Sequence, residues 1–188
     1  MLMHKAYRYR IYPNAEQQHL IHKIFGCCRF VFNHFLSQWN DTHQNTGKGL
    51  SYSSCATQLP GLKTTFSWLK EVDSIALQSA VRHVADSFDR FIKKQNDAPR
   101  FKSRKHPVQS YTTKMTNANI AIEGNRIKLP KLGWLRFANS RDMEGRILSA
   151  TVRRNAAGKY FVSVVCEVEM LPLPQTDTSI GIDHTFRM

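Results

Sequence analysis

The stretch KAYRYRIYPNAEQ at residues 5–17 joins a strand to a helix, and this junction decides the fold. Its first half alternates between two sets of side chains, which are Tyr7, Tyr9 and Ile11 on one side and Arg8 and Arg10 on the other. A period of two predicts a strand, here with one basic face. Pro13 ends the strand. Asn14 with Gln17 three residues later has the form of a capping box, so a helix is predicted to begin here.

Two long helices are predicted between this junction and Pro99. Apolar side chains recur there every three or four residues, which is the spacing of a buried helical stripe. The first stripe holds Leu20, Ile24, Cys28, Val31, Phe35 and Trp39, and the second, in a helix capped by Ser74, holds Leu77, Val81, Val84, Phe88 and Phe91. The polar run at residues 40–50 predicts a loop, followed by short helices at 51–59 and 66–70.

The pattern changes from helical spacing to alternation after residue 99. Strands are predicted at residues 109–114, 120–122, 126–129, 134–137, 147–154 and 160–169. The fold class is therefore α+β. We expect an antiparallel β-barrel built from residues 1–12 and 100–172, with a helical lobe at 13–99 inserted after the first strand. Residues 173–188 are expected to form a linker and the start of one further strand.

The balance of charge indicates a nucleic-acid backbone as partner. The chain holds 27 Lys and Arg against 14 Asp and Glu, which gives a net charge of +13 and an isoelectric point near 9.9. These cations interleave with Tyr, Phe and Trp, as in proteins that bind phosphodiester strands. The alternative is a soluble protein that is basic without binding nucleic acid.

Other classes of protein find little support in the sequence. No apolar run approaches the roughly 18 residues of a membrane span and no signal peptide opens the chain, so we expect a cytoplasmic protein without a membrane partner. The four cysteines form no C-x-x-C pair, and no Cys/His cluster has zinc-site spacing, so buried thiols and no metal site are expected. Phosphate loops and nucleophile elbows are missing as well, and no small-molecule substrate is predicted.

Candidate binding residues lie in both parts of the chain. Tyr52 follows a glycine-containing loop and is expected to be an exposed aromatic that stacks on a base. Gln78, Thr116 and Asn117 are candidates for contacts to base edges. The predicted contacts to the phosphate backbone are Lys48, Arg100, Lys102, Arg104, Lys105, Lys131, Arg153 and Arg154, with Lys128 and Arg136 adding charge to the strands. The alternative for each is an ordinary solvated surface residue.

Asp183 is the one acid that suggests catalysis. It ends the apolar stretch SIGID at residues 179–183, and an Asp at the end of such a strand is a recurrent metal ligand. Two-metal cleavage of a phosphodiester needs several carboxylates that converge on the ions. No later acid follows Asp183. On the residues alone, Asp183 is therefore interpreted as an ordinary residue of the tail.

The order of motifs resembles the TnpB family, the OrfB-type proteins of bacterial insertion sequences that were long called transposases. The matching segments are KAYRYRIYPNAEQ (5–17), RFVFNHFL (29–36), GKGLSY (47–52), EVDSIALQ (71–78), PRFK (99–102), SYTTKMTNANI (110–120), IKLPKLGW (127–134) and GID (181–183). They follow in order along residues 4–183. Family members are also similar to the type V CRISPR effectors, of which they look like the ancestors.

The resemblance implies an RNA-guided DNA endonuclease. The family fold is a wedge β-barrel interrupted by a helical recognition lobe, followed by an RNase-H-like nuclease domain of which only the first strand would fall in this chain. The implied partners are a guide RNA from the transposon end and double-stranded DNA with a transposon-adjacent motif. By position, Tyr52, Gln78 and Thr116 match family residues that contact this motif. Ala56 and Ser74 differ from the family, which leaves the identity of the motif open.

The resemblance also assigns a role to Asp183, which matches the first catalytic aspartate. The later carboxylates that bind Mg²⁺ and the cysteines of a zinc ribbon would lie beyond residue 188, and HTFRM at 184–188 departs from the family pattern. We therefore expect a truncated chain that does not cleave DNA alone. Three hypotheses stay open: a binding module without nuclease, a decayed remnant of a transposase-type nuclease, or an enzyme completed in trans by a separately encoded half.

Overall fold

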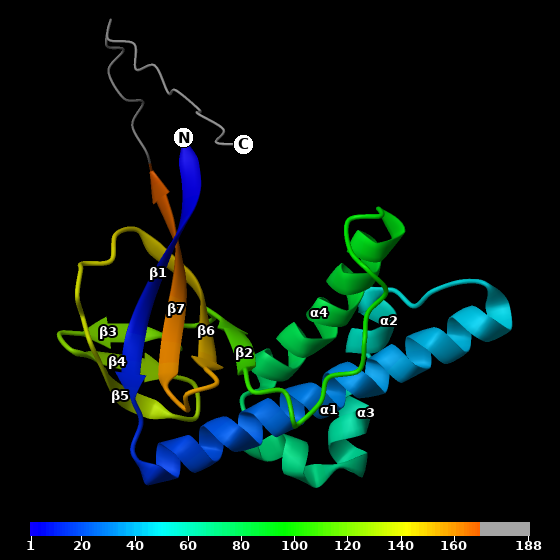
Figure 1. Cartoon of the computed structure of the whole chain (residues 1–188), viewed down its shortest axis with the longest axis horizontal. Helices are drawn as coiled ribbons and strands as arrows, with labels where there is room; N and C mark the ends of the chain where they lie inside the picture. The colour runs from blue at the N-terminus through cyan, green and yellow to red at the C-terminus, as the bar shows by residue number, and fades with distance from the viewer. Residues whose placement is uncertain (170–188) are drawn as a thin grey trace, which may run out of the picture.

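A computed structural model describes residues 1–169 of the chain. Its elements are β1 (Leu2–Tyr12), α1 (Ala15–Thr46), α2 (Tyr52–Ala56), α3 (Leu59–Thr65), the 3₁₀ helix η1 (Ser67–Glu71), α4 (Ser74–Ile92), β2 (Gln109–Lys114), β3 (Ala121–Glu123), β4 (Arg126–Leu129), β5 (Gly133–Phe137), β6 (Arg146–Arg154) and β7 (Tyr160–Glu169). Figure 1 shows the strands gathered on one side and the helices on the other, joined by α1. The linker and further strand predicted at 173–188 lie outside the described residues.

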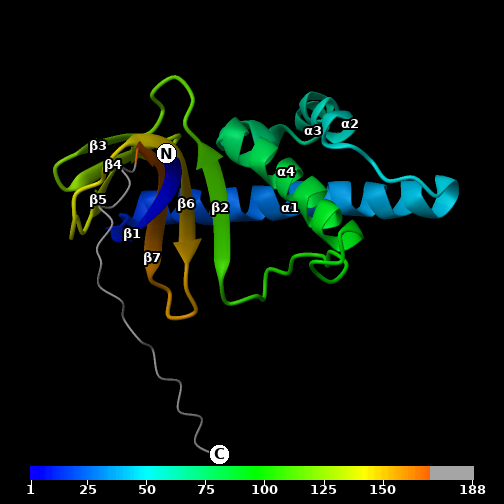
Figure 2. The same cartoon turned by 90° about the horizontal axis from the view of Figure 1, so that it is seen from above.

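The strands form one open sheet. All seven are antiparallel, in the order β2-β6-β7-β1-β5-β4-β3. The α+β class and the helical insertion after the first strand agree with the prediction, but the closed barrel was wrong, because β2 and β3 are unpaired edges. The sheet stays open because β2 packs against α1 and α4 instead of reaching β3. Figure 2 shows β2 beside α4, at the end of the sheet away from β3.

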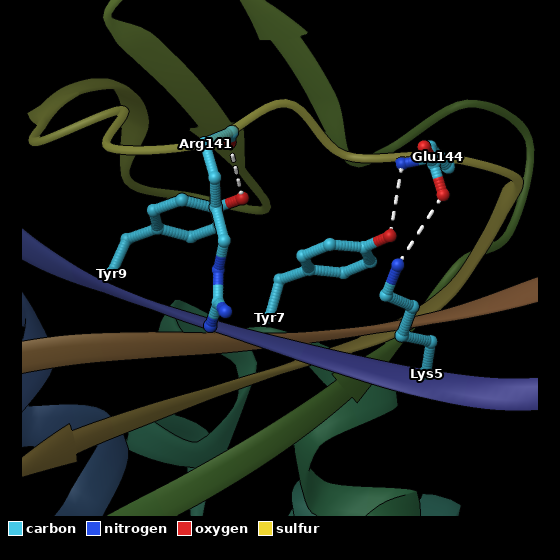
Figure 3. A network of polar contacts seen from close by, with 5 residues as sticks. All are labelled: Lys5, Tyr7, Tyr9, Arg141 and Glu144. Carbon is cyan, nitrogen blue, oxygen red and sulfur yellow. Dashed lines mark hydrogen bonds and ion pairs between the residues drawn. The ribbon is translucent and has the colours of Figure 1, made fainter.

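The connection from β5 to β6, residues 138–145, crosses β1 and β7, because these two strands lie between β5 and β6 in the sheet. Two tyrosines of β1 hold it in place (Figure 3). Tyr9 Oη donates a hydrogen bond to the carbonyl oxygen of Arg141 at 2.8 Å, and Glu144 N–H donates to Tyr7 Oη at 3.3 Å. Each tyrosine is 2% exposed. The apolar face predicted for this strand is thus buried beneath the crossing segment.

The junction between β1 and α1 folds as predicted. Asn14 Oδ1 accepts from Gln17 N–H at 2.8 Å and Gln17 Oε1 accepts from Asn14 N–H at 3.1 Å, which makes the capping box. Residues 40–46, predicted as loop, instead continue α1. The ring of Trp39 stacks on Phe88 of α4 with centroids 3.5 Å apart. This contact joins α1 to α4 at Trp39. Beyond it, residues 43–46 are exposed, and the helix ends in a left-handed cap at Gly47, whose N–H donates to the carbonyl oxygen of His43.

The start of α4 is capped by Asp73, not by the predicted Ser74. Asp73 Oδ1 accepts from Ile75 N–H at 3.0 Å, and Ser74 is the first helical residue. The other carboxylate oxygen, Asp73 Oδ2, accepts from Thr113 Oγ1 of β2 at 2.5 Å. Both partners are buried. One side chain therefore caps the helix and joins it to the edge of the sheet.

No helix within residues 1–169 combines the length and the apolar character that a membrane crossing requires.

Candidate nucleic-acid interface

A basic groove lies where α1, the segment after α4 and the β6–β7 hairpin meet. Its volume is about 490 Å³, and its lining residues are His19, His22, Lys23, Phe25, Arg29, Arg104, Gln109 and Arg154. An adjoining cavity of about 370 Å³ shares Phe25, Arg29 and Gln109 with it. None of the residues that line the groove is a carboxylate, so its positive potential is not cancelled within the lining. We call these eight residues the basic groove.

Three arginines of the basic groove remain without an ion pair inside the described residues. The four ion pairs there include Lys23 with Glu71 but none of Arg29, Arg104 and Arg154. A guanidinium presents several donors in one plane and suits a phosphate group. The unpaired arginines come from three separate segments, so the fold brings them together.

The segment after α4 is fixed although it contains neither helix nor strand. Asn33 of α1 forms two hydrogen bonds with the backbone of Lys102, from its Nδ2 to the carbonyl oxygen at 2.9 Å and from the Lys102 N–H to its Oδ1 at 2.8 Å. Arg29 donates to Gln109 Oε1 at 3.2 Å. These bonds hold Arg104 in the groove and leave Phe101 58% exposed. The backbone that carries the cations of this segment is thus anchored to α1.

His22 is an exposed residue of the groove whose ring contacts Tyr160. Its Nε2 lies 2.7 Å from Tyr160 Oη. Burial lowers the pKa of His22, and the charges of Arg154 and His19 lower it further. A bound phosphate has the opposite effect on an imidazole, because a nearby negative charge favours the protonated form. The groove therefore contains a group whose charge can respond to an anion.

The predicted backbone cations do not form one surface. Arg104 and Arg154 line the basic groove. Arg153 pairs with Phe161 in the sheet register, and since neighbouring strand residues point to opposite faces, it lies on the other side of the sheet from Arg154. Lys102 lines the adjoining cavity and a separate pocket beside Phe32 and His83, and not the basic groove. Its Nζ lies 4.0 Å from the ring of Phe32, and burial lowers its pKa.

Other predicted cations lie elsewhere. Lys48 follows the end of α1, and Lys131 is in the turn between β4 and β5 with a φ of +65°. Arg100 Nη2 lies 3.8 Å from Asp97, and both side chains are exposed. Lys105 is also exposed, next to the groove in sequence. These residues are surface cations whose contacts to nucleic acid stay a prediction.

The residues that α1 contributes to the basic groove were not among the predicted binding residues. His19, His22 and Lys23 are spaced by three and one along the helix, and Arg29 follows two turns later on the same side. This polar stripe was visible in the sequence. Its partner segment was not, because the contact between α1 and residues 101–110 is long-range.

The four candidates for contacts to DNA bases lie on three segments. Tyr52 begins α2, and its ring lies 3.5 Å from the guanidinium carbon of Arg82, so it is not the free loop aromatic that was predicted. Gln78 is an exposed residue of α4. Thr116 and Asn117 are exposed in the loop after β2, where Asn117 has a φ of +50°. The bond between Asp73 and Thr113 joins the start of α4 to the end of β2, so it connects two of these segments.

The four cysteines are buried and unpaired, as expected. Within residues 1–169, no group of three or more His, Cys, Asp or Glu side chains is arranged to hold a metal ion. Asp183 lies outside the described residues.

The chain is similar to proteins of bacterial insertion sequences. A family model described as a helix-turn-helix domain of OrfB proteins matches residues 1–48, the range of β1 and α1. The chain is 31% identical over 183 residues to "Putative RNA-guided DNA endonuclease InsQ" of Escherichia coli (strain K12), which covers 95% of this chain and 44% of that protein. It is 32% identical over 184 residues to "Putative RNA-guided DNA endonuclease" of Streptomyces pristinaespiralis, covering 95% and 45%.

A third relative is shorter. The chain is 33% identical over 115 residues to "Virulence protein VsdF" of Salmonella dublin, covering 55% of this chain and 96% of that protein. The chain spans less than half the length of the other two relatives.

Proposed function

We propose, since this chain belongs to the TnpB/OrfB family of insertion-sequence proteins, that it binds a guide RNA and contributes to RNA-guided recognition of DNA. In this proposal the basic groove holds the phosphate backbone of the guide, and base pairing between guide and target supplies the choice of sequence. One observation carries the proposal. The basic groove gathers six cationic or imidazole side chains from three segments without a carboxylate.

The arrangement suits a phosphate backbone more than a small anion. Arg104 and Arg154 reach the groove from separate segments, and Arg29 is oriented by its bond to Gln109. Several separated cations in an open depression match a chain of phosphates better than a single one. Such contacts depend on backbone charge and not on the bases, which is what a protein that leaves sequence reading to the guide requires.

We assign contacts with a DNA motif to the other candidates. Gln78 is exposed on α4, and an amide side chain can bond an adenine edge through two hydrogen bonds. Tyr52 carries the guanidinium of Arg82 on its ring, so the pair offers a cation and an aromatic surface together. Thr116 and Asn117 follow the end of β2, close in sequence to Thr113, whose bond to Asp73 joins β2 to the start of α4. These residues would read double-stranded DNA beside the target.

The first experiment is to purify the chain from cells that carry its native locus and to sequence the RNA that accompanies it. A discrete RNA from the transposon end is expected. Featureless cellular RNA, or none, would contradict guide binding.

The groove is then tested with Arg104→Gln/Arg154→Gln. Its matched control is Lys70→Gln/Lys93→Gln, which removes the same charge from exposed positions outside the groove. The salt dependence of RNA binding should flatten by about 1.4 logarithmic units per decade of salt in the groove variant if the contacted RNA is single-stranded. The control should change little. Equal flattening in both would assign the binding to net charge instead of to the groove.

For the motif, Gln78→Ala should weaken binding to DNA that carries the motif by about 1–3 kcal/mol while leaving scrambled DNA nearly unaffected. Equal losses on matched and scrambled DNA would contradict this assignment.

A further inference from the structure

The outward face of the sheet carries a second set of cations, interleaved with aromatic rings. In the register, Arg10 of β1 lies opposite Phe161 of β7, and Tyr12 of β1 lies opposite Arg136 of β5. Directly paired residues of an antiparallel sheet share a face. Tyr7 and Tyr9, by alternation, point to the other face, under the segment that connects β5 to β6.

Ring contacts link these side chains into a ladder. The guanidinium carbons of Arg8 and Arg10 lie 4.4 and 5.4 Å from the ring centroid of Phe161, and those of Arg10 and Arg136 lie 5.5 and 5.6 Å from that of Tyr12. We call these five residues the arginine–aromatic ladder. Contacts of a guanidinium with a ring restrict the side chain while leaving its N–H donors free to bind an anion.

Within residues 1–169, the guanidinium donors of the ladder form no ion pair. Arg8, Arg10 and Arg136 belong to none of the ion pairs of the described residues. Arg10 Nε is buried and has no hydrogen-bond partner there. An unpaired buried donor costs free energy unless a ligand satisfies it. The geometry of the ladder therefore favours an anion on this face.

A hollow of about 310 Å³ opens at the end of the ladder. Tyr12 and Arg136 line it together with three short polar side chains, Asn125, Asn139 and Ser140. The Tyr12 side chain is 49% exposed. The volume falls at the lower end of the range of ligand pockets, about 300–1,000 Å³. An aromatic ring, a cation and hydrogen-bonding groups thus converge on a space the size of a small ligand.

We propose that this hollow binds one unpaired nucleotide of a single-stranded nucleic acid. The base stacks on Tyr12, its phosphate contacts Arg136 and Arg10, and the amides of Asn125 and Asn139 contact its edge. Stacking requires an exposed base face, which a duplex does not offer because its bases stack on one another. The site is separate from the basic groove. Arg153 pairs with Phe161 of the ladder, whereas Arg154, which lines the groove, points to the opposite face of the sheet. The identity of the strand as guide RNA rests on the proposed function.

The test uses the purified full chain, freed of RNA, and fluorescent twelve-nucleotide strands of uridine RNA and thymidine DNA, with a duplex DNA of equal length. Tyr12→Leu should weaken binding of both single strands by about 5- to 150-fold, the loss of one stacked base, and leave duplex binding within about two-fold. Arg136→Gln should lower the salt slope for single strands by about 0.7. Arg104→Gln in the basic groove is the control and should lower the slope on single strands while leaving the Tyr12 effect intact.

Two results would overturn the inference: Tyr12→Leu binding single strands as the parent does, or losing single strands and duplex equally. Thermal unfolding checks that the variants fold, and if Tyr12→Leu melts early, Asn139→Ala replaces it under the same criteria. A strand with one 4-thiouridine gives a second readout, because the crosslink should map to the peptide around Tyr12 or Arg136.

The inference and the proposed function fail separately. Binding that depends on Tyr12, with no discrete RNA retained from cells, would uphold the site and reject guide binding. A retained guide with no dependence on Tyr12 would do the reverse.

Discussion

Thr113 lies fully buried on β2 and donates its hydroxyl to Asp73, so replacing it with Val removes one hydrogen bond without leaving a large cavity. A hydrogen bond to a charged group contributes about 1.5–3 kcal/mol, and Asp73 would keep only its bond from Ile75 N–H. We expect Thr113→Val to lower the free energy of unfolding by about 2 kcal/mol. For a chain of this size that corresponds to a fall in Tm of about 4–8 °C.

The assay is thermal and urea unfolding followed by circular dichroism. Thr112→Val is the matched control, because Thr112 precedes Thr113 on the same strand, is half-buried and bonds the neutral Thr151 at 2.9 Å. Its loss should cost less than about 1 kcal/mol. Equal losses in the two variants, or none in Thr113→Val, would refute the role of Asp73 as the link between α4 and the sheet.

Three further predictions concern protonation, backbone conformation and thiol reactivity. Burial lowers the pKa of His22 and a bound phosphate raises it, so binding takes up a proton. The affinity for RNA should therefore rise as the pH falls from about 8 to about 5, and His22→Gln should reduce that rise. Gly145→Ala should lower the free energy of unfolding, measured with urea, by about 2 kcal/mol or more, because its φ is +83° and an added Cβ would clash with the carbonyl oxygen of Glu167 in β7. Gly61→Ala is the control: its Cβ would meet open space, so the free energy of unfolding should stay the same or rise. Burial raises the pKa of the Cys27 thiol to about 11 and raises that of Cys28 as well, so maleimide should label the folded chain slowly at pH 8 and quickly in denaturant; fast labelling of the folded chain would contradict their burial.

Features set by neighbours in sequence were predictable. The capping box of Asn14 and Gln17 depends on residues three apart, and the alternation of Tyr7 and Tyr9 with Arg8 requires no tertiary information. The opposite faces of Arg153 and Arg154 follow from the same period of two, although both were predicted to contact the phosphate backbone. Local rules therefore placed these side chains correctly relative to their own strand or helix.

Features set by distant contacts were not predictable. The polar residues 40–46 have the composition of a loop, yet they continue α1 past the stacking of Trp39 on Phe88 as far as the cap at Gly47. Closure of a barrel depends on whether β2 meets β3, and the bond from Thr113 to Asp73 directs β2 toward the helices instead. Neither pairing leaves a signature in a single sequence.

The residues of the candidate site were likewise predictable only where neighbours in sequence decide their position. The sequence predicted from a local charge cluster that Arg104 contacts a phosphate backbone, and in the structure Arg104 lines the basic groove, while the contact itself stays a prediction. Lys102, from the same cluster, lies over Phe32, because Asn33 holds its backbone against α1. Arg29 belongs to the polar stripe of α1, but that stripe alone does not show which segment it faces. Its place in the groove comes from its bond to Gln109, 80 residues away in the chain.

The position of β1 in the sheet has a consequence for how the protein is made. Leu2 pairs with Glu169 and Ile11 with Tyr160, so β1, which is synthesised before the other described strands, pairs along its length with the last of them. The helices between them can pack through contacts nearer in sequence before the partner strand of β1 is synthesised. Until β7 is synthesised, β1 displays an apolar face and unpaired backbone groups, the features that drive strands of different chains to associate. The sheet can therefore cover β1 only after translation has passed residue 169. A ribosome that stalls earlier leaves β1 exposed to association with other chains.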